Sequence, residues 1–308
     1  MKSLRELNID FMGIRRPAIA ISVLLVLGSI ASLAIRGLNF GLDFTGGTLV
    51  ELSFPARADP QEVREKLEHA GFVKGVVQNF GTERDLLIRM PPQRGRQESK
   101  IGNEVFAALQ SDYPGVQLRR SEFVGPVVGE ELREKGGLAM VASLICVMIY
   151  IMFRFTSKFA IGAVIALIHD AIITLGSFSV FQWNFDLTGL AAVLAIIGYS
   201  INDTIVVFDR IRENFRAMRR ATPEQTINVS INQTLDRTIG TSSTVLLVLI
   251  ALALWGGEVV HGFSLSLIVG VVAGTYSSVY IAANLLVMLG MSREDLLTPE
   301  KEKEQTMP

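Results

Sequence analysis

Two pairs of polar residues stand inside strongly apolar stretches of the sequence. His169 and Asp170 are adjacent in one stretch, and Asn202 and Asp203 are adjacent in the next. An ionisable side chain within a membrane span costs at least about 2.5 to 3.5 kcal/mol on insertion scales, so it usually faces a partner or a water-filled path. A carboxyl group that is exposed to one side and then to the other can load and unload a proton, which is a transport step.

Asp203 is the leading site residue. It lies six residues before Asp209, hence roughly 9 Å deeper along a helix, too deep for a short carboxylate to reach the headgroups. The alternative is an aspartic acid that is neutral or hydrogen-bonded and only holds helices together. His169 and Asp170 are about 100° apart around a helix, so they cannot both point the same way, and either one could be structural.

Arg237 is a further candidate, at the start of a later apolar stretch. Hydropathy alone would let its side chain extend into water there, so the sequence supports a functional charge and a solvated arginine equally. The arginines between the stretch that contains Asp203 and the later stretch that begins near Arg237 are most simply a determinant of membrane orientation. They are Arg210, Arg212, Arg216, Arg219 and Arg220.

Membrane spans are the elements that must position these residues. Of the 308 residues, 49% are hydrophobic and 19% charged, and the mean hydropathy of +0.39 is well above that of soluble proteins. A spanning helix needs roughly 20 mostly apolar residues. The stretches of that length are Pro17 to Ile35, Gly136 to Phe153, Phe159 to Phe181, Phe185 to Phe208, Ile239 to Gly256 and Phe263 to Leu289. The sequence predicts a polytopic α-helical membrane protein with six transmembrane helices, the last five within residues 136–289.

The first span, residues 17–35, follows two arginines and resembles a secretory signal. Its apolar run is too long for a signal of about 7 to 15 apolar residues, so we expect an uncleaved anchor. Leu4, Leu7, Phe11 and Ile14 recur before it at helical spacing. This pattern predicts an interfacial helix within the cytoplasmic segment 1–16, with a frayed tail as the alternative.

The basic residues of the short connections predict the orientation of the spans. The connections after spans two and four carry Arg and Lys, whereas residues 182–184 and 257–262 carry none. Basic connections lie on the cytoplasmic side. We therefore expect both termini, including the tail at 290–308, on the cytoplasmic side, and residues 36–135 on the far side of the membrane.

Residues 36–135 alternate between strand and helix patterns. Asp59 and Pro60 are typical of a helix start, and Gly71 of a helix end. The expected elements are, in order, a strand at 48–54, a helix at 60–69, strands at 74–80 and 85–90, a helix at 97–109 and a strand at 116–123. The order β-α-β-β-α-β predicts a ferredoxin-like α+β domain between spans one and two.

Three segments resemble the SecD/SecF family of protein-export membrane proteins. The string GLDFTGG at Gly41–Gly47 resembles its first periplasmic signature. The run SINDTIVVFDRIREN at Ser200–Asn214 resembles the fourth-span signature of the SecF branch, and TLDRTIGTS at Thr234–Ser242 resembles the start of span five. The resemblance extends in order over essentially the whole chain. The family belongs to the resistance-nodulation-division superfamily, whose members couple ion flow to work on their outer face.

The resemblance implies an accessory subunit of the bacterial Sec protein translocase, placed in the inner membrane with residues 36–135 in the periplasm. Such a subunit uses the proton motive force, with SecD, to promote late steps of polypeptide export after the step driven by the SecA ATPase. The implied partners are SecD as a separate protein, the Sec translocon channel with its associated subunits, unfolded exported polypeptides and membrane lipids. The implied energy source is the proton gradient, with no cofactor.

The family's site residues carry over position by position. Asp203 matches the membrane-embedded aspartate that carries the proton, and Arg237 matches the arginine associated with it. Asn202, His169 and Asp170 are candidates for the proton path.

Movement of the outer domain would need a mechanical link to the spans. Asp43, Phe44, Thr45, Gly46 and Gly47 could provide one part of that link, and Gly125–Gly129 the other. Ordinary turn geometry is the alternative for both segments.

Other classes of function are expected to be absent or less favoured. A net charge of −1 gives no positive field for nucleic acid. With Cys146 as the single cysteine and no HExxH motif, we expect no metal site, and no nucleophile or phosphate loop predicts an enzyme. Half of a proton-coupled small-molecule exporter and a non-transporting scaffold subunit remain as alternatives. An exporter would be expected to have a second large outer domain, and a scaffold needs no ionisable residue at Asp203.

Overall fold

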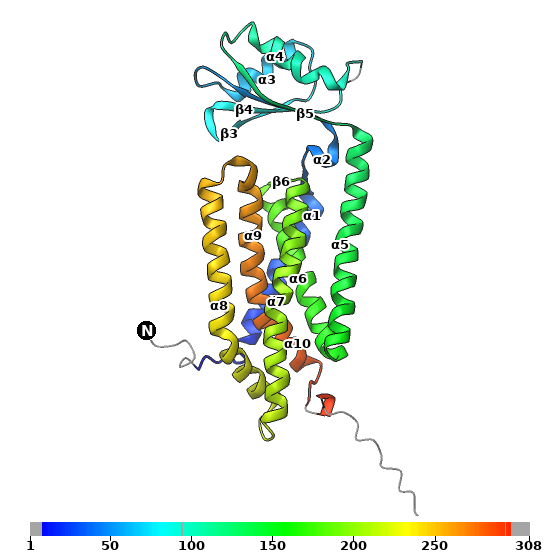
Figure 1. Cartoon of the computed structure of the whole chain (residues 1–308), viewed down its shortest axis with the longest axis vertical. Coiled ribbons are helices and arrows are strands. Elements are labelled where there is room, and N and C mark those ends of the chain that lie inside the picture. Colours follow the sequence, from blue (N-terminus) through cyan, green and yellow to red (C-terminus); the bar gives the residue numbers. More distant parts are fainter. Residues whose placement is uncertain (1–7, 94, 293, 297–308) are drawn as a thin grey trace, which may run out of the picture.

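The computed structural model describes residues 8–93, 95–292 and 294–296. Six helices within these residues are long and apolar enough to cross a membrane, and they form a bundle with an α+β domain at one end (Figure 1). The first five are α1 (Arg15–Arg36), α5 (Pro126–Arg154), α6 (Ser157–Phe181), α7 (Leu187–Ala217) and α8 (Pro223–Trp255). The predicted set of six helices long and apolar enough to span a membrane is thus present in the described residues.

The sixth span contains one irregular turn. α9 (Glu258–Ser277) is followed directly by the π-helical segment η3 (Ser278–Ala282) and then by α10 (Ala283–Met288). π-Turns inside α-helices are rare and frequently lie at functional sites.

Three helices extend beyond the apolar stretches that predicted them. α5 begins at Pro126, α7 continues to Ala217, and α8 begins at Pro223 after a capping box in which Thr222 and Gln225 bond reciprocally. An apolar stretch marks only the lipid-crossing part of a helix, so these polar ends were not predicted as helix. Arg237 consequently lies inside a continuous helix and not at its start.

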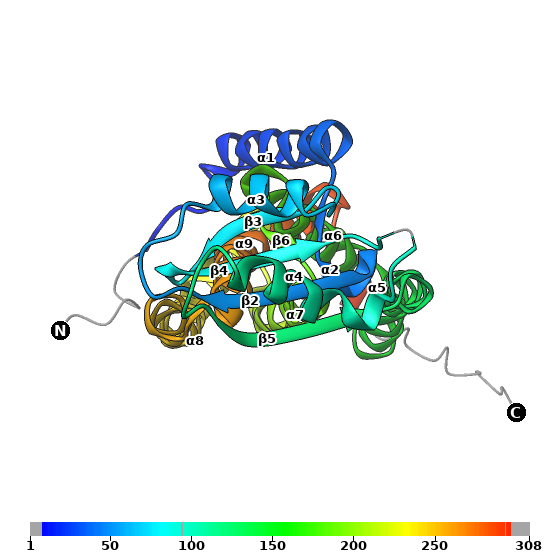
Figure 2. The same cartoon turned by 90° about the horizontal axis from the view of Figure 1, so that it is seen from above.

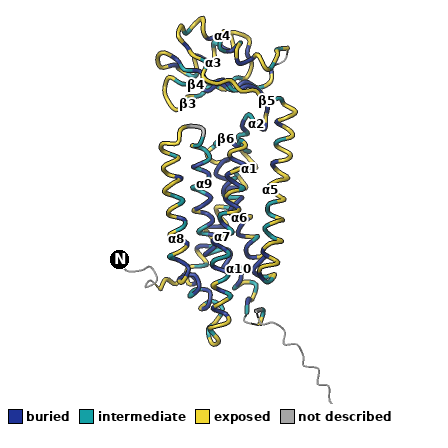
Figure 3. The backbone as a smooth tube through the Cα atoms, viewed as in Figure 1, coloured by how far each residue is buried: buried dark blue, intermediate teal, exposed yellow. Residues whose placement is uncertain are grey.

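The six spans divide into central and peripheral helices. In the most apolar 18 residues of α6, α7 and the sixth span, 61%, 50% and 50% of the positions are buried, whereas α1, α5 and α8 reach only 17%, 11% and 17% (Figure 3). His169 and Asp170 lie on α6, and Asn202 and Asp203 lie on α7. Both predicted pairs therefore occupy central helices.

The segment before α1 differs from the predicted interfacial helix. Residues 8–10 have no regular secondary structure and residues 11–14 form a turn, and Phe11 and Met12 are buried against the bundle. The side chain of Asn232 accepts from the Ile9 N–H at 2.9 Å and donates to the Ile9 carbonyl at 2.9 Å. These bonds replace those that a helix would supply, so the helical interpretation is wrong for residues 8–14. Leu4 and Leu7, on which it also depended, lie outside the described residues.

The α+β domain contains four strands and two helices. The strands are β2 (Gly47–Ser53), β3 (Val76–Phe80), β4 (Thr82–Met90) and β5 (Gln117–Val124), and the helices are α3 (Pro60–His69) and α4 (Ile101–Gln110). All neighbouring strands are antiparallel, in the spatial order β3-β4-β2-β5. Both helices cover the face of the sheet that points away from the bundle (Figures 1 and 2). Val50, Leu52, Leu86 and Ile88 are fully buried on that face.

The other face of the sheet looks toward the bundle. A cavity of about 410 Å³ lies there, between residues of β2 to β5 and the chain around residues 182–188 and 261–263. Arg89 on β4 crosses this space and donates from Nη1 to Asn184 Oδ1 at 2.8 Å. A short parallel pair, β1 (Asn39–Phe40) with β6 (Asn184–Phe185), ties the connection after α1 to the connection between α6 and α7.

Candidate functional site

Asp203 is buried between two helices of the bundle. The residue is 2% exposed, interacts with Ser242 on α8, and lies within electrostatic range of the Arg237 guanidinium. Its Oδ2 atom is buried and has no hydrogen-bond partner among the described residues. A carboxylate oxygen can accept two hydrogen bonds. Oδ2 is therefore an atom that could hold a proton without breaking an existing contact.

Arg237 lies near Asp203 without forming a direct ion pair with it. Ion pairs with N···O distances up to 4.0 Å in the described chain do not include these two residues. Arg237 is an exposed residue of α8 and lines a cavity of about 390 Å³ with Asn202, Asp209 and Gln233. The cavity lies between α7 and α8, so the arginine brings a positive charge to the helix that carries Asp203. Asn202 faces this cavity and is exposed.

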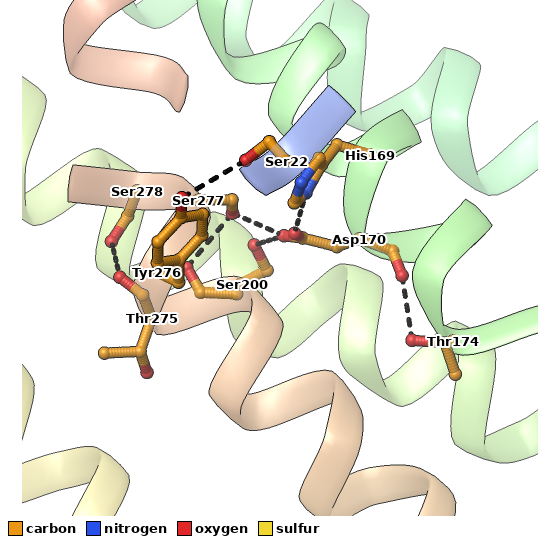
Figure 4. Close-up of polar contacts among 10 residues, drawn as sticks. Ser22, His169, Asp170, Thr174, Ser200, Thr275, Tyr276, Ser277 and Ser278 are labelled. Carbon is orange, nitrogen blue, oxygen red and sulfur yellow. Dashed lines mark hydrogen bonds and ion pairs between the residues drawn. The ribbon is translucent and has the colours of Figure 1, made fainter. Parts of the chain in front are cut away.

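Asp170 and His169 form a second buried cluster (Figure 4). Asp170 has no exposed surface and His169 is 6% exposed. Asp170 Oδ2 accepts from Ser200 Oγ on α7 at 2.5 Å and from Ser277 Oγ on α9 at 2.7 Å, and Asp170 Oδ1 lies 2.9 Å from His169 Nδ1. The two neighbours on α6 thus bend toward each other despite the 100° between their positions. One carboxyl group connects three central helices.

The serines that contact the two carboxyl groups were missed in the sequence. Ser200, Ser242 and Ser277 each lie in an apolar stretch, and Ser200 is three residues before Asp203. A serine hydroxyl inside a helix can instead bond to a carbonyl of its own preceding turn. Its presence in a span is therefore a weak signal, and only the packing of α6, α7, α8 and α9 identifies these three.

The structure separates the predicted proton-path residues into two groups. Asp203, Asn202 and Arg237 lie on the side of α7 that faces α8. His169 and Asp170 lie on the side that faces α6 and α9. A direct contact between the two groups is absent among the described residues. Groups of three or more His, Cys, Asp or Glu that could hold a metal are likewise absent from the described part of the chain.

The predicted hinge residues lie where the α+β domain joins the bundle. Asp43 Oδ2 accepts from the Leu187 N–H at 3.0 Å, and Phe44 stacks on Phe185 with ring centroids 5.7 Å apart. Gly47 has φ +120°, and a Cβ there would lie 2.3 Å from the Met90 carbonyl oxygen. A side chain at this position would therefore clash with the backbone of β4 as well as strain its own.

The glycine before it is equally restricted. Gly46 has φ +69°, and an added Cβ would lie 2.8 Å from Pro126 Cα, at the start of α5. Thr45, the last residue of α2 (Leu42–Thr45), donates from Oγ1 to the Gly41 carbonyl at 3.1 Å. Close backbone approach thus fixes the glycine pair between the first and second spans. Gly129 has the same constraint from the other side, since its Cβ would lie 2.9 Å from Gly46 N.

Known proteins share both the site helices and this junction. The family model described as protein export membrane protein SecD/SecF, C-terminal, matches residues 104–292, which is more than half of the chain. The chain belongs to the SecD/SecF family. The SecD/SecF GG motif matches residues 31–54, and that range contains the restricted Gly46–Gly47 pair. Family membership and six apolar helices identify a multi-pass inner-membrane protein.

Individual members of the SecD/SecF family match over nearly their full length. The protein translocase subunit SecF of Pseudomonas aeruginosa is 51% identical over 295 residues, 95% of each chain. The SecF subunit of Escherichia coli O157:H7 is 46% identical over 297 residues, 96% of this chain and 92% of that one.

Two solved SecDF structures have the same fold. SecDF from Thermus thermophilus, described as a translocon-associated membrane protein, superposes with a TM-score of 0.84 at 35% identity. SecDF in its super-membrane-facing form gives a TM-score of 0.69 at 36% identity. The matches cover 93% and 92% of this chain but only 39% of each SecDF chain. This chain therefore spans about two fifths of the solved SecDF proteins.

Proposed function

We propose that this chain is an accessory subunit of the Sec translocase that works with SecD and uses the proton motive force to promote late steps of polypeptide export. Asp203 carries the proposal. It is a 2% exposed carboxyl group on a central helix, with a free oxygen beside the charge of Arg237. It lies in a chain that is 51% identical to a protein translocase subunit SecF. The role is transport and not catalysis, and no cofactor is required.

In this proposal Asp203 holds the transported proton and Arg237 balances its charge when the proton has left. Each proton that moves down 100 mV supplies about 2.3 kcal/mol from the potential alone. That energy changes a two-state equilibrium by nearly two powers of ten. The cavity between α7 and α8 supports the assignment, because Asn202, the chain neighbour of Asp203, lines it together with Arg237. Asn202 then belongs to the path of the proton.

The α+β domain is proposed to be ferredoxin-like and to lie in the periplasm, with both termini in the cytoplasm. The strand order β3-β4-β2-β5 with two helices on one face supports the fold. The basic residues support the orientation. Arg154 and Lys158, at the connection of α5 to α6, and the arginines at the end of α7 lie at the end of the bundle opposite the α+β domain (Figure 1).

The junction at Asp43–Gly47 is proposed to transmit movement of the helices to the α+β domain. Asp43 holds the start of α7 through the Leu187 N–H, and Gly46 packs against the start of α5. A movement of α7 therefore also moves the strand β2, which begins at Gly47. Unfolded exported polypeptides are the proposed clients of that domain. Its outer strands β3 and β5 each have one unpaired edge in the sheet, which offers main-chain groups to an extended chain.

The proposed partners are SecD, the Sec translocon channel with its associated subunits, and membrane lipids. The SecDF matches support SecD in particular, because this chain superposes on only 39% of each SecDF chain. The peripheral helices α1, α5 and α8 expose most of their apolar surface in the single chain. Such surface must be covered by lipid or by partner helices.

Proton conduction tests the proposal. The complex with SecD is reconstituted in liposomes, and a pH-sensitive dye reports proton flux under an imposed potential. Asp203→Asn removes titration with almost no change in size, so we expect normal assembly with loss of flux and of proton-driven export. Glu134→Gln, at an exposed position on α5 away from the cavity between α7 and α8, is the control and should behave as wild type. Normal flux and export with Asp203→Asn would contradict the proton-carrier role and leave the scaffold function.

A further inference from the structure

We propose that Asp170 and His169 form a second proton-binding site, separate from Asp203, and that the two sites are coupled through α7 and α9. The inference deepens the proposed function and rests on it for the role of Asp203. It begins from a carboxyl group with no exposed surface in the middle of the bundle. Its contacts come from three helices, α6, α7 and α9 (Figure 4).

The ionised form of Asp170 has a complete set of donors. A carboxylate only accepts hydrogen bonds, so Ser200 Oγ and Ser277 Oγ both donate to Oδ2, at 2.5 and 2.7 Å. His169 Nδ1 lies 2.9 Å from Oδ1 and donates to it in the tautomer with the proton on Nδ1. In this form one carboxylate fixes α7 and α9 to α6.

The protonated form of Asp170 is also satisfied by the same residues. A proton added at His169 Nε2, which is buried and has no partner among the described residues, allows the Nδ1 proton to pass to Asp170 Oδ1 across 2.9 Å. The new O–H then donates to Nδ1, and the net change is one bound proton. Ser277 Oγ can turn to the Gly274 carbonyl, which already lies 3.1 Å away. Two complete arrangements differ by one proton and one serine contact.

Neighbouring groups do not fix the charge of this site. An Arg or Lys contact to Asp170 is absent among the described residues, and the charged residues of α1 and α5 lie toward the ends of those helices. The titratable groups in the apolar parts of the packed elements do not bond to Asp170 either. They are Cys146 and Tyr150 on α5, Tyr199 and Asp203 on α7, Tyr276 on α9 and Tyr280 on η3. His169 also lines a cavity of about 300 Å³ on the α1 side of α6, away from Asp203.

Coupling to Asp203 follows from shared segments of two helices. Ser200 is one helical turn before Asp203 on α7. On α9, Thr275 Oγ1 lies 2.7 Å from Ser242 Oγ, and Ser242 contacts Asp203. Ser277, two residues further on, contacts Asp170 and directly precedes η3. Oδ2 of Asp170 stays an acceptor when Oδ1 is protonated but no longer carries charge, so its bond from Ser277 weakens. A turn of Ser277 toward the Gly274 carbonyl then acts on the same turn of α9 that reaches Asp203. The occupancy of each site by a proton should change that of the other.

Infrared spectroscopy of the full chain in lipid nanodiscs tests the second site. Isotope labelling of the aspartate carboxyl carbons separates the aspartic acid C=O band from that of glutamic acid during a pH titration. We expect Asp170→Asn, which is nearly isosteric, to remove one buried component of this band. We expect Asp203→Asn to remove a different component. A spectrum of Asp170→Asn identical to wild type throughout the titration would overturn the second site.

A pair of serine variants tests the geometry and the coupling. Ser277→Ala should keep the Asp170 component and shift its C=O frequency, because one donor to the carboxyl group is lost. Ser266→Ala is the matched control, since Ser266 is also buried on α9 but donates to the Phe263 carbonyl. Coupling requires that Asp170→Asn also moves the midpoint of the Asp203 component by about one pH unit. An unchanged Asp203 component in Asp170→Asn would overturn the coupling, and an unchanged Asp170 component in Ser277→Ala would overturn the geometry of the second site. Proton flux with Asp203→Asn decides the proposed function separately.

Discussion

The α+β domain and the membrane bundle bury different kinds of side chain. The core of the α+β domain is apolar, with Val50, Leu52 and Ile88 at 0% exposure, and the buried polar residues described between residues 47 and 124 are only Thr48 and Gln93. The bundle buries many serines and threonines together with Asp170 and Asp203. Its peripheral helices instead expose large apolar side chains to the surroundings (Figure 3).

The difference reflects the solvent that each region meets. In water, removal of apolar surface drives folding. In lipid that driving force between helices is absent, and packing and polar contacts hold the helices together. Serine and threonine hydroxyls supply such contacts at low cost because many bond to their own helix, as Thr174 does to the Asp170 carbonyl at 2.8 Å. Buried carboxyl groups are far more costly in lipid, which is why they point to function and the hydroxyls do not.

Loss of apolar packing should produce the largest effect on stability in the α+β domain. Its core cluster is formed by residues of that domain alone, so we expect residues 47–124 to fold when expressed without the bundle. Leu52→Ala, at a position with 0% exposure, should lower the free energy of unfolding by about 2 to 5 kcal/mol. Urea unfolding followed by circular dichroism measures it. Val73→Ala, at a 60% exposed position, is the control and should cost under about 0.5 kcal/mol. A fragment without a cooperative transition would show that the bundle is needed for this core.

In the bundle, the chemistry of one charged group should matter more than its volume. Arg237→Lys keeps the charge but loses the planar group with five donors. If Arg237 serves Asp203, we expect a partial defect in proton flux of about fivefold, equivalent to roughly 1 kcal/mol. Arg237→Met should lose nearly all flux with little change in expression. Full activity of Arg237→Met would show that the arginine is only solvated.

Apolar length and regular turn signals made the architecture predictable. The six spans followed from stretches of apolar residues. The order of strands and helices in the α+β domain followed from the alternation of apolar and polar residues and from the helix start at Asp59 and Pro60. Asp59 Oδ1 does accept a hydrogen bond from the Gln61 N–H there, at 2.8 Å. Helix ends were less predictable, because polar helical turns at Pro126 and after Phe208 leave no apolar signal. The structure of residues 8–14 depends on two asparagines more than 200 positions away.

Only the carboxyl groups of the site could be predicted from the sequence, because an ionisable residue inside an apolar stretch is unusual in itself. Asp170 and Asp203 were found because carboxyl groups are rare in apolar stretches. Their different neighbours depend on how α6, α7, α8 and α9 pack, and that packing also selects Ser200, Ser242 and Ser277 from the many hydroxyl residues of the spans. The contact between His169 and Asp170 required side-chain rotation that positions on a helix do not specify.

The smallest expected effect concerns a carboxyl group that faces water. Hydrogen bonds from Ser53 and Thr82, the latter at 2.6 Å, lower the pKa of Asp85 on β4 below its usual value, and Arg119 and Arg84 act in the same direction. The folded state therefore favours the ionised form. Its contribution to stability is present above the pKa of the unfolded chain, and it is lost as the pH falls through the lower pKa of the folded state.

Asp85→Asn should accordingly destabilise the fragment 47–124 at pH 7 but not near pH 2, where the wild-type group is protonated. Because Asp85 is only slightly buried, solvent screening limits the difference at pH 7 to about 0.5 kcal/mol. Urea midpoints of both proteins, measured across the acid range, report it, and Glu68→Gln on the exposed side of α3 is the control. A difference that persists unchanged at low pH would mean that Asp85 acts through shape and not charge. Asp85→Asn and Asp203→Asn make the same chemical change, one at a group that faces water and one in the bundle. The different effects of these two substitutions could then not be explained by ionisation alone.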